Sequence, residues 1–213
     1  MEHAKKCMII GAAPIREAGL FQEFKPEEYF VICADGGFET ALRFGIHPDL
    51  IIGDFDSARS APPAGLTVRR LPVEKDVTDV QAAVMEGFHR GYFSFALLGC
   101  LGGERLDHTL ANMNVLVYIA EHGGTGFMAD ETTRVFLLAN GRLRFTQMKG
   151  HTVSVFPFKS PTCNVSYSGL QYPLNHGTLL TGGTLMGVSN AILADDAEIY
   201  VHKGMALIIT VAP

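Results

Sequence analysis

The order of apolar segments is the feature that most limits how this chain can fold. In the first two thirds, apolar runs of strand length alternate with amphipathic stretches that have helical spacing. The expected strands span 6–12, 29–34, 50–52, 68–71 and 93–98, and the expected helices span 38–44, 78–90 and 108–121. Because these strands are continuously apolar, we expect a parallel sheet that helices cover on both faces.

The pattern changes after about residue 130, where short strand-like pieces follow one another between glycine and proline turns. The expected strands span 132–138, 143–145, 152–157, 163–167, 184–187, 198–202 and 206–211. We therefore predict the α/β fold class in two domains. Residues 1–132 form a parallel-sheet α/β domain, and residues 133–213 form an antiparallel β-sandwich.

Aspartates gather where the expected strands of the first domain end. They are Asp35, Asp49, Asp54, Asp56, Asp76 and Asp79. In the densest segment an apolar strand ends in Asp54-Phe55-Asp56, and residues i and i+2 of an extended chain point to the same side. Two such carboxylates repel each other unless a cation or a proton lies between them, and Mg²⁺ prefers oxygen ligands and often brings phosphates. The pattern favours a metal-bound polyphosphate over a plain surface turn, at the carboxyl edge of the sheet.

Three more segments lie at similar places between a strand and a helix: Ala34–Gly37, Lys75–Asp79 and Gly99–His108. Glycines allow close backbone approach, and helix N-termini with an arginine can bind phosphate. Each segment taken alone is also explained by helix capping, with Thr78 and Asp79 capping one helix and Asp107 the next. A single shared site explains all of the segments more simply than independent accidents do.

The bulk properties exclude several classes of function. The net charge is −5, and there is no basic run, so nucleic acid and anionic membranes are not expected as partners. No apolar run reaches the roughly 18 residues that a membrane span needs. The four cysteines have no metal-binding spacing, which predicts reduced core thiols in a cytoplasmic protein.

The motifs together strongly resemble the thiamine pyrophosphokinase family of the bacterial type. The matching residues are Ala34-Asp35-Gly36-Gly37, Gly45-x-x-Pro48-Asp49, Gly53-Asp54-Phe55-Asp56-Ser57, Lys75-Asp76-x-Thr78-Asp79, Gly103-x-Arg105-x-Asp107-His108, Asn112, Gly169-Leu170-x-Tyr172-Pro173-Leu174 and Gly187-x-Ser189-Asn190. The resemblance implies a catalytic α/β domain that binds ATP and Mg²⁺, a thiamine-binding β-sandwich and a homodimer. It also implies Mg²⁺-dependent transfer of pyrophosphate from ATP to the thiamine hydroxyl, with release of AMP.

The resemblance also implies roles for single residues. Mg²⁺ would be bound by Asp54, Asp56 and Asp79. Thiamine or the transferring group would be contacted by Asp35, Thr78 and Asp107. Arg105 would contact ATP phosphate, Asn112 would contact substrate, and Ser189 and Asn190 would bind thiamine. Either Asp79 or Asp107 can accept the hydroxyl proton.

Two features depart from the family pattern. Ala191 and Ile192 follow Ser189-Asn190, where relatives often have an acidic residue and an aromatic one. The chain also has no tryptophan, so Tyr172 or a phenylalanine is expected to stack on the thiamine ring. Two other functions use similar features: an Asp-x-Asp phosphatase that needs Mg²⁺, and a non-catalytic sensor of thiamine or nucleotide.

Overall fold

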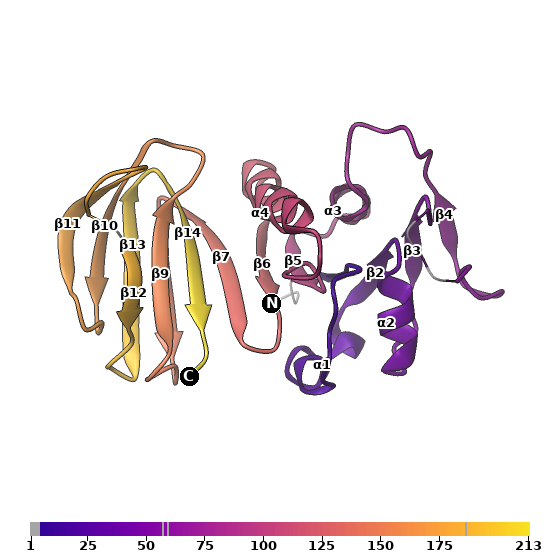
Figure 1. Cartoon of the computed structure of the whole chain (residues 1–213), viewed down its shortest axis with the longest axis horizontal. Helices are drawn as coiled ribbons and strands as arrows, with labels where there is room; N and C mark the ends of the chain where they lie inside the picture. The colour runs from indigo at the N-terminus through magenta and orange to yellow at the C-terminus, as the bar shows by residue number, and fades with distance from the viewer. Residues whose placement is uncertain (1–4, 57, 59, 186) are drawn as a thin grey trace. The chain divides into compact units, whose positions relative to one another are not determined.

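The computed structural model describes residues 5–56, 58, 60–185 and 187–213, in two compact units, Met1–Glu131 and Thr132–Pro213. Figure 1 labels their helices and strands. The first unit contains β1 (Lys6–Ile10), α1 (Gly19–Phe24), the 3-10 helix η1 (Pro26–Glu28), β2 (Phe30–Ala34), α2 (Gly37–Arg43), β3 (Leu50–Gly53), β4 (Val68–Arg70), α3 (Asp79–His89), β5 (Ser94–Leu98), α4 (Leu106–Glu121) and β6 (Thr125–Ala129). No helix of the described residues is long and apolar enough to cross a membrane.

The first unit is built on a parallel sheet in which the strands lie in the order β6-β5-β1-β2-β3-β4. Its central strands are buried on both faces, as their continuous apolar sequence predicts. Met8 packs in one core cluster with Phe38 of α2, whereas Cys7 faces Gly87 of α3. Successive residues of β1 thus meet helices on opposite faces of the sheet.

The second unit consists of two antiparallel sheets. Its strands are β7 (Thr133–Ala139), β8 (Arg142–Thr146), β9 (Thr152–Pro157), β10 (Thr162–Ser168), β11 (Leu174–Leu180), β12 (Gly187–Ala191), β13 (Asp196–Lys203) and β14 (Met205–Val211). They form the layers β11-β10-β13-β8 and β12-β9-β14-β7. Val165 and Ile199 of one layer share a buried cluster with Val153 and Ile208 of the other. These units confirm the predicted fold class of an α/β domain and an antiparallel β-sandwich.

Several elements differ from the expectation. Helix α1 and strands β6 and β11 were not expected, because they are short, partly exposed or rich in glycine and so lack a clear apolar period. The strand expected at 184–187 was wrong: β12 begins at Gly187, and part of the expected run, Met186, lies outside the described residues. Strand β12 also pairs with β9 through a register shift, which disrupts its alternation.

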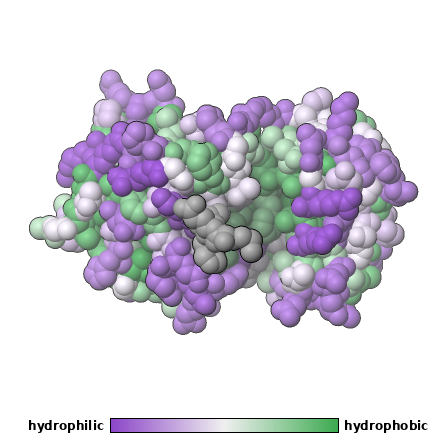
Figure 2. Space-filling model, turned by 180° about the vertical axis from the view of Figure 1, so that it is seen from behind, coloured by the Kyte–Doolittle hydropathy of each residue, from purple (hydrophilic) through white to green (hydrophobic). Residues whose placement is uncertain are grey.

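Apolar side chains are concentrated in these two cores. The face shown in Figure 2 is covered largely by hydrophilic side chains, with hydrophobic ones between them. Burial of the apolar runs leaves the polar loops at the strand ends to carry the chemistry of the molecule.

The two glycines after β2 have different structural roles. A Cβ atom on Gly37 would lie 2.0 Å from the carbonyl oxygen of Ile10, whereas a Cβ on Gly36 would meet nothing closer than 3.7 Å. The start of α2 therefore packs directly on the end of β1, which only glycine allows at position 37.

Gly37→Ala should destabilise the protein by about 2–4 kcal/mol, because the added methyl group overlaps the backbone of β1. Gly36→Ala is the matched control and should change the free energy of unfolding by less than about 1 kcal/mol. Urea denaturation of both variants measures the difference. Equal stabilities of the two variants would contradict this packing.

Candidate active site

Two neighbouring parallel strands bring the first aspartates together. Asp35 follows β2 and Asp54 follows β3, and the backbone N–H of Asp35 donates to the carbonyl of Ile52, 2.8 Å away. A Cβ on Gly53 would lie 2.9 Å from the Cα of Asp35, so glycine allows this close approach. Asp35 itself has φ +47°, a left-handed conformation that aspartate tolerates better than most residues. The strand ends therefore hold these carboxylates side by side.

Lys75 links the carboxylates that follow β3 to the start of α3. Its Nζ donates to Asp54 Oδ2 and lies 3.3 Å from Asp79 Oδ1. All of these side chains are largely buried: Lys75 is 13% exposed, Asp54 7% and Asp79 20%. Thr78 caps the helix as expected, because its Oγ1 accepts from the N–H of Gln81 at 3.2 Å. The cap fixes Asp79 at the first position of α3.

The charges of these carboxylates shift one another's pKa values. Burial raises the pKa of Asp35, and the charges of Asp79, Asp54 and Asp56 raise it further, although the Gly36 N–H opposes this. Burial also raises the pKa of Asp79, with Lys75 opposing and Asp54 and Asp56 adding to the rise. The hydrogen bond from Lys75 instead lowers the pKa of Asp54. The cluster therefore carries more negative charge than Lys75 neutralises.

The donor set of this cluster fits a hard divalent cation. Asp35 Oδ1 and Asp79 Oδ1 are buried and accept no hydrogen bond from the residues that the structure describes. The backbone N–H of Asp56 donates to Asp54 Oδ1 at 3.2 Å and folds the Asp-x-Asp turn onto itself. Among the described residues no three acidic, histidine or cysteine side chains already stand in metal-ligand geometry. Buried carboxylate oxygens of this kind suit Mg²⁺, which prefers oxygen ligands.

The structure pairs Arg105 and Asp107 with each other rather than with this cluster. Their side chains form a bidentate ion pair, with N–O distances of 2.9 and 2.6 Å, and both are exposed. Arg105 lowers the pKa of Asp107 to about 2. The expectation that Asp107 caps this helix was wrong: α4 begins at Leu106, Arg105 occupies the capping position, and Asp107 lies in the first turn. The ion pair holds Asp107 there.

Asn112 holds the glycine-rich loop before α4. It is buried, and its Nδ2 donates to the carbonyl of Cys100 at 3.0 Å. One turn earlier, Thr109 Oγ1 donates to the carbonyl of Gly102 at 3.2 Å. These bonds give Asn112 a structural task in addition to the substrate contact expected from sequence.

In the second unit, the two motifs expected to bind thiamine interlock. Asn190 Oδ1 accepts from the Tyr172 N–H at 2.9 Å, and Asn190 Nδ2 donates to the Tyr172 carbonyl at 2.8 Å. Asn190 is 8% exposed, whereas Tyr172 is 63% exposed. Ser189 is exposed with φ +56°, and its N–H donates to Ser154 Oγ at 3.1 Å. Asn190 thus fixes the backbone that presents the Tyr172 ring.

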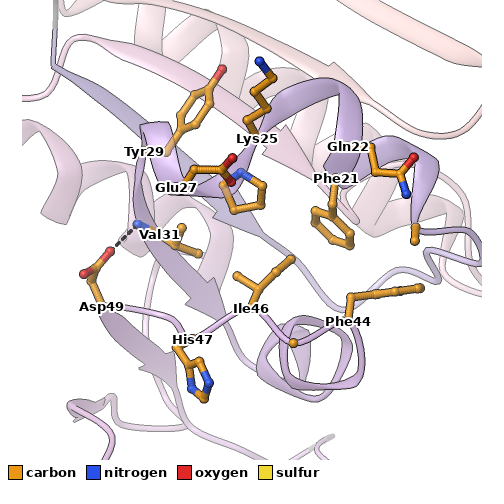
Figure 3. Close-up of a pocket in the computed structure, with 13 residues that line it drawn as sticks. Phe21, Gln22, Lys25, Glu27, Tyr29, Val31, Phe44, Ile46, His47 and Asp49 are labelled. Carbon is orange, nitrogen blue, oxygen red and sulfur yellow. Dashed lines mark hydrogen bonds between the residues drawn. The ribbon is translucent and has the colours of Figure 1, made fainter.

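A separate hollow of about 810 Å³ lies at the amino ends of β2 and β3 (Figure 3). Phe21, Phe44 and Ile46 are among its apolar lining residues. Asp49 also lines it, and there its Oδ2 accepts from the Val31 N–H at 2.7 Å (Figure 3). Asp49 is therefore a structural residue at the opposite edge of the sheet from the carboxylate cluster.

Sequence reasoning missed the placement of two cationic residues. They are Lys75, which the sequence motifs place only within the segment Lys75–Asp79, and Arg70, which lies in none of the motifs. The Arg70 guanidinium lies 5.1 Å from the centre of the ring of Phe55, the residue that separates Asp54 from Asp56 in the sequence. The registry of β4 with β3, which places Arg70 opposite Gly53, decides this contact. Ser57 of the same motif lies outside the described residues.

Asp35→Asn should stabilise the metal-free protein, because it removes a partly buried charge that three carboxylates repel. Asparagine also tolerates the left-handed backbone. Solvent screening limits the gain to about 1 kcal/mol, or about 2–4 °C in Tm. Thermal unfolding in EDTA measures this, with Asp196→Asn on the exposed side of β13 as the control.

The same variant predicts a pH dependence. The folded-state pKa of Asp35 lies above its ordinary value of 3.8, so the folded protein binds the proton more tightly than the unfolded chain. The destabilisation by Asp35 therefore develops as the pH rises from 3.8 through the folded-state pKa. The Tm difference between Asp35→Asn and the wild type should shrink as the pH falls toward 3.8 and disappear below it. An undiminished difference there would contradict the electrostatic cause.

Comparison with known proteins identifies the family of both units. The model of the thiamin pyrophosphokinase catalytic domain matches residues 21–126, and that of its vitamin B1 binding domain matches residues 142–206. Thiamine pyrophosphokinase of Bacillus subtilis is 26% identical over 192 residues, which cover 87% of this chain and 89% of that protein. Thiamine pyrophosphokinase 1 of Arabidopsis thaliana is 26% identical and covers 85% of this chain and 77% of that protein.

Solved structures show the same fold over nearly the whole chain. The crystal structure of thiamine pyrophosphokinase from Bacillus subtilis superposes with a TM-score of 0.84 at 25% identity, covering 98% of this chain and 100% of that one. Thiamin pyrophosphokinase from Candida albicans shares the fold, with a TM-score of 0.79 at 18% identity, covering 97% of this chain and 89% of that one. Together with the two matching domain models, these likenesses show that the chain is an enzyme of the thiamine pyrophosphokinase family.

Proposed function

We propose that this enzyme uses Mg²⁺ to transfer a pyrophosphate group from ATP to the hydroxyl group of thiamine, which gives thiamine diphosphate and AMP. The observation that carries the proposal is the buried carboxylate cluster at the carboxyl edge of the first unit. Its carboxylates repel one another, and Asp35 Oδ1 and Asp79 Oδ1 accept no hydrogen bond from the described residues, which suits a divalent cation that carries a polyphosphate. The names of the relatives supply the thiamine substrate.

Within this proposal, Asp54, Asp56 and Asp79 bind the metal, which neutralises charge on the phosphate oxygens when it is present. The thiamine hydroxyl oxygen attacks the β-phosphorus of ATP, the bond from that phosphorus to the α-phosphate oxygen breaks, and AMP leaves with the electron pair. Arg105 contacts the phosphates of ATP, and Asn112 contacts substrate. Asp35 and Thr78 contact thiamine or the transferring group.

The hydroxyl proton needs an acceptor whose pKa is not too low. Asp107 is a weak base, because Arg105 holds its pKa at about 2. Burial and neighbouring charge raise the pKa of Asp79 instead. Of the two acceptors that the sequence left open, Asp79 is therefore the stronger base in the metal-free enzyme, and we propose that Asp107 orients Arg105 beside the phosphates.

The second unit is proposed to bind thiamine. The exposed Tyr172 ring offers a flat, electron-rich surface for the cationic thiazolium group. Asn190 supports this ring through the Tyr172 backbone, and the neighbouring Ser189 of β12 is exposed and available for polar contact. Binding of thiamine by one subunit next to the carboxylates of another would require the homodimer that we propose. Four buried free thiols fit a cytoplasmic protein.

The reaction is tested by incubating the pure protein with Mg²⁺, ATP and thiamine. We expect AMP and thiamine diphosphate in equal amounts. Asp54→Asn should lower kcat at least about a hundredfold, because it removes a charge that binds the metal, and the metal would neutralise charge on the transferring phosphate. Chromatography of the nucleotides and thiamine products measures both results.

Asp49→Asn is the matched control, since asparagine keeps an oxygen that can accept from Val31 and this site lies away from the cluster. Its activity should stay near that of the wild type. Release of ADP or phosphate would instead indicate a phosphatase or another kinase, and tight thiamine binding without products would indicate a sensor. Normal turnover of Asp54→Asn at saturating Mg²⁺ would remove Asp54 from the metal site.

The role of Tyr172 can be followed by fluorescence, because the chain has no tryptophan. Tyr172→Trp should retain activity, and thiamine should quench its emission by direct stacking. Tyr172→Ala should raise the KM for thiamine about tenfold, because the ring contact contributes about 1 kcal/mol or more. Asn190→Ala in the Tyr172→Trp background should weaken the quenching, because it removes the two hydrogen bonds from the Asn190 side chain to the backbone of residue 172.

Tyr29→Trp is the control for unspecific quenching by thiamine, because Tyr29 lies in the first unit at the amino ends of the strands, away from the carboxylate cluster. Equal quenching in Tyr29→Trp and Tyr172→Trp would show that thiamine does not stack on residue 172. An unchanged quenching curve after Asn190→Ala would show that the hydrogen bonds of Asn190 do not position the ring of residue 172.

A further inference from the structure

Lys75 occupies the place where a cation between Asp54 and Asp79 would lie. Its ammonium group hydrogen-bonds to Asp54 and lies 3.3 Å from Asp79 Oδ1, which itself accepts no hydrogen bond from the described residues. The Lys75 side chain is only 13% exposed, so most of its charge is removed from water. A buried ammonium group is stable there because the carboxylates compensate it.

One ammonium group is a poor match for this cluster. The charges of Asp54, Asp56 and Asp79 all act on Asp35, whose buried Oδ1 has no donor among the described residues. A divalent cation would bring twice the charge of Lys75 to the same oxygens. Both cannot occupy the place at once, because like charges at such distances repel strongly.

We infer that Lys75 is a resident counter-ion that fills the metal position of the nucleotide-free enzyme and leaves it when metal and nucleotide bind together. The inference rests on the proposed metal role of Asp54 and Asp79. The flexible four-carbon stem allows the ammonium group to turn away from the carboxylates, and nucleotide phosphates offer it a new partner. Free metal must displace Lys75 without that compensation.

This arrangement couples the two ligands. A nucleotide whose phosphates pair with the Lys75 ammonium group strengthens metal binding. The metal strengthens nucleotide binding by the same factor. The coupling keeps the carboxylate cluster from collecting divalent ions when no nucleotide is present. It needs no movement of the backbone, only a change of rotamer at Lys75.

The test is Mn²⁺ binding, followed by the electron paramagnetic resonance signal of free Mn²⁺, with protein alone and with α,β-methylene ATP. Lys75→Met keeps the length of the stem and removes the charge, so Mn²⁺ should bind to the protein alone at least about tenfold more tightly than to the wild type. The added nucleotide should tighten Mn²⁺ binding less in Lys75→Met than in the wild type. Lys6→Met, which removes an exposed lysine paired with Glu28, should bind Mn²⁺ as the wild type does.

Lys75→Arg keeps the positive charge but changes the shape of the side chain, so it distinguishes an effect of charge from an effect of shape. It also provides the test if Lys75→Met does not fold. It should bind Mn²⁺ alone no more tightly than the wild type, with a clear gain on adding nucleotide. Equal or weaker Mn²⁺ binding by Lys75→Met, or equally tight binding by Lys75→Arg and Lys75→Met, overturns the counter-ion role alone. Absence of Mn²⁺ binding by every protein, even with nucleotide, overturns the proposed metal site as well.

Discussion

The parallel pairing of β2 with β3 is the contact on which the active-site region depends. It places Asp35 against the end of β3, where the missing side chain of Gly53 leaves room and the Ile52 carbonyl binds the Asp35 N–H. The position of Asp54 follows, since it comes directly after Gly53. A capped helix then delivers Asp79 to the same edge. Backbone hydrogen bonds thus hold these acidic side chains close together although their negative charges repel one another.

The carboxylate cluster lowers the stability of the metal-free protein, and the same charges favour the binding of a cation. Carboxylates with raised pKa values, whose buried oxygens accept no hydrogen bond from the described part of the chain, weaken the metal-free fold, and Lys75 offsets only part of that effect. The surrounding strands can tolerate it because their buried apolar side chains stabilise the sheet independently of its carboxyl edge. A cation with nucleotide would relieve the repulsion, so the same charges that strain the empty site favour its ligand.

Motif residues outside the carboxylate cluster mostly hold loops in place. Asn112 binds the glycine-rich loop before α4, and Asn190 binds both backbone groups of Tyr172. Each is buried, and each joins segments that are separate in sequence. A side-chain amide suits this task because it carries a donor and an acceptor that match a backbone peptide group. Residues of a binding motif can therefore act through the surface that they support.

The sequence by itself determined the α/β and β-sandwich architecture, because continuous and alternating apolar patterns read directly onto buried and half-buried strands. It also indicated the acidic edge, since residues after parallel strands meet there. Only the tertiary structure decided that Lys75 lies between Asp54 and Asp79, that Arg105 engages Asp107, and that β12 starts at Gly187. These depend on side-chain direction and strand register, which arise from contacts between distant segments and leave no local period in the chain.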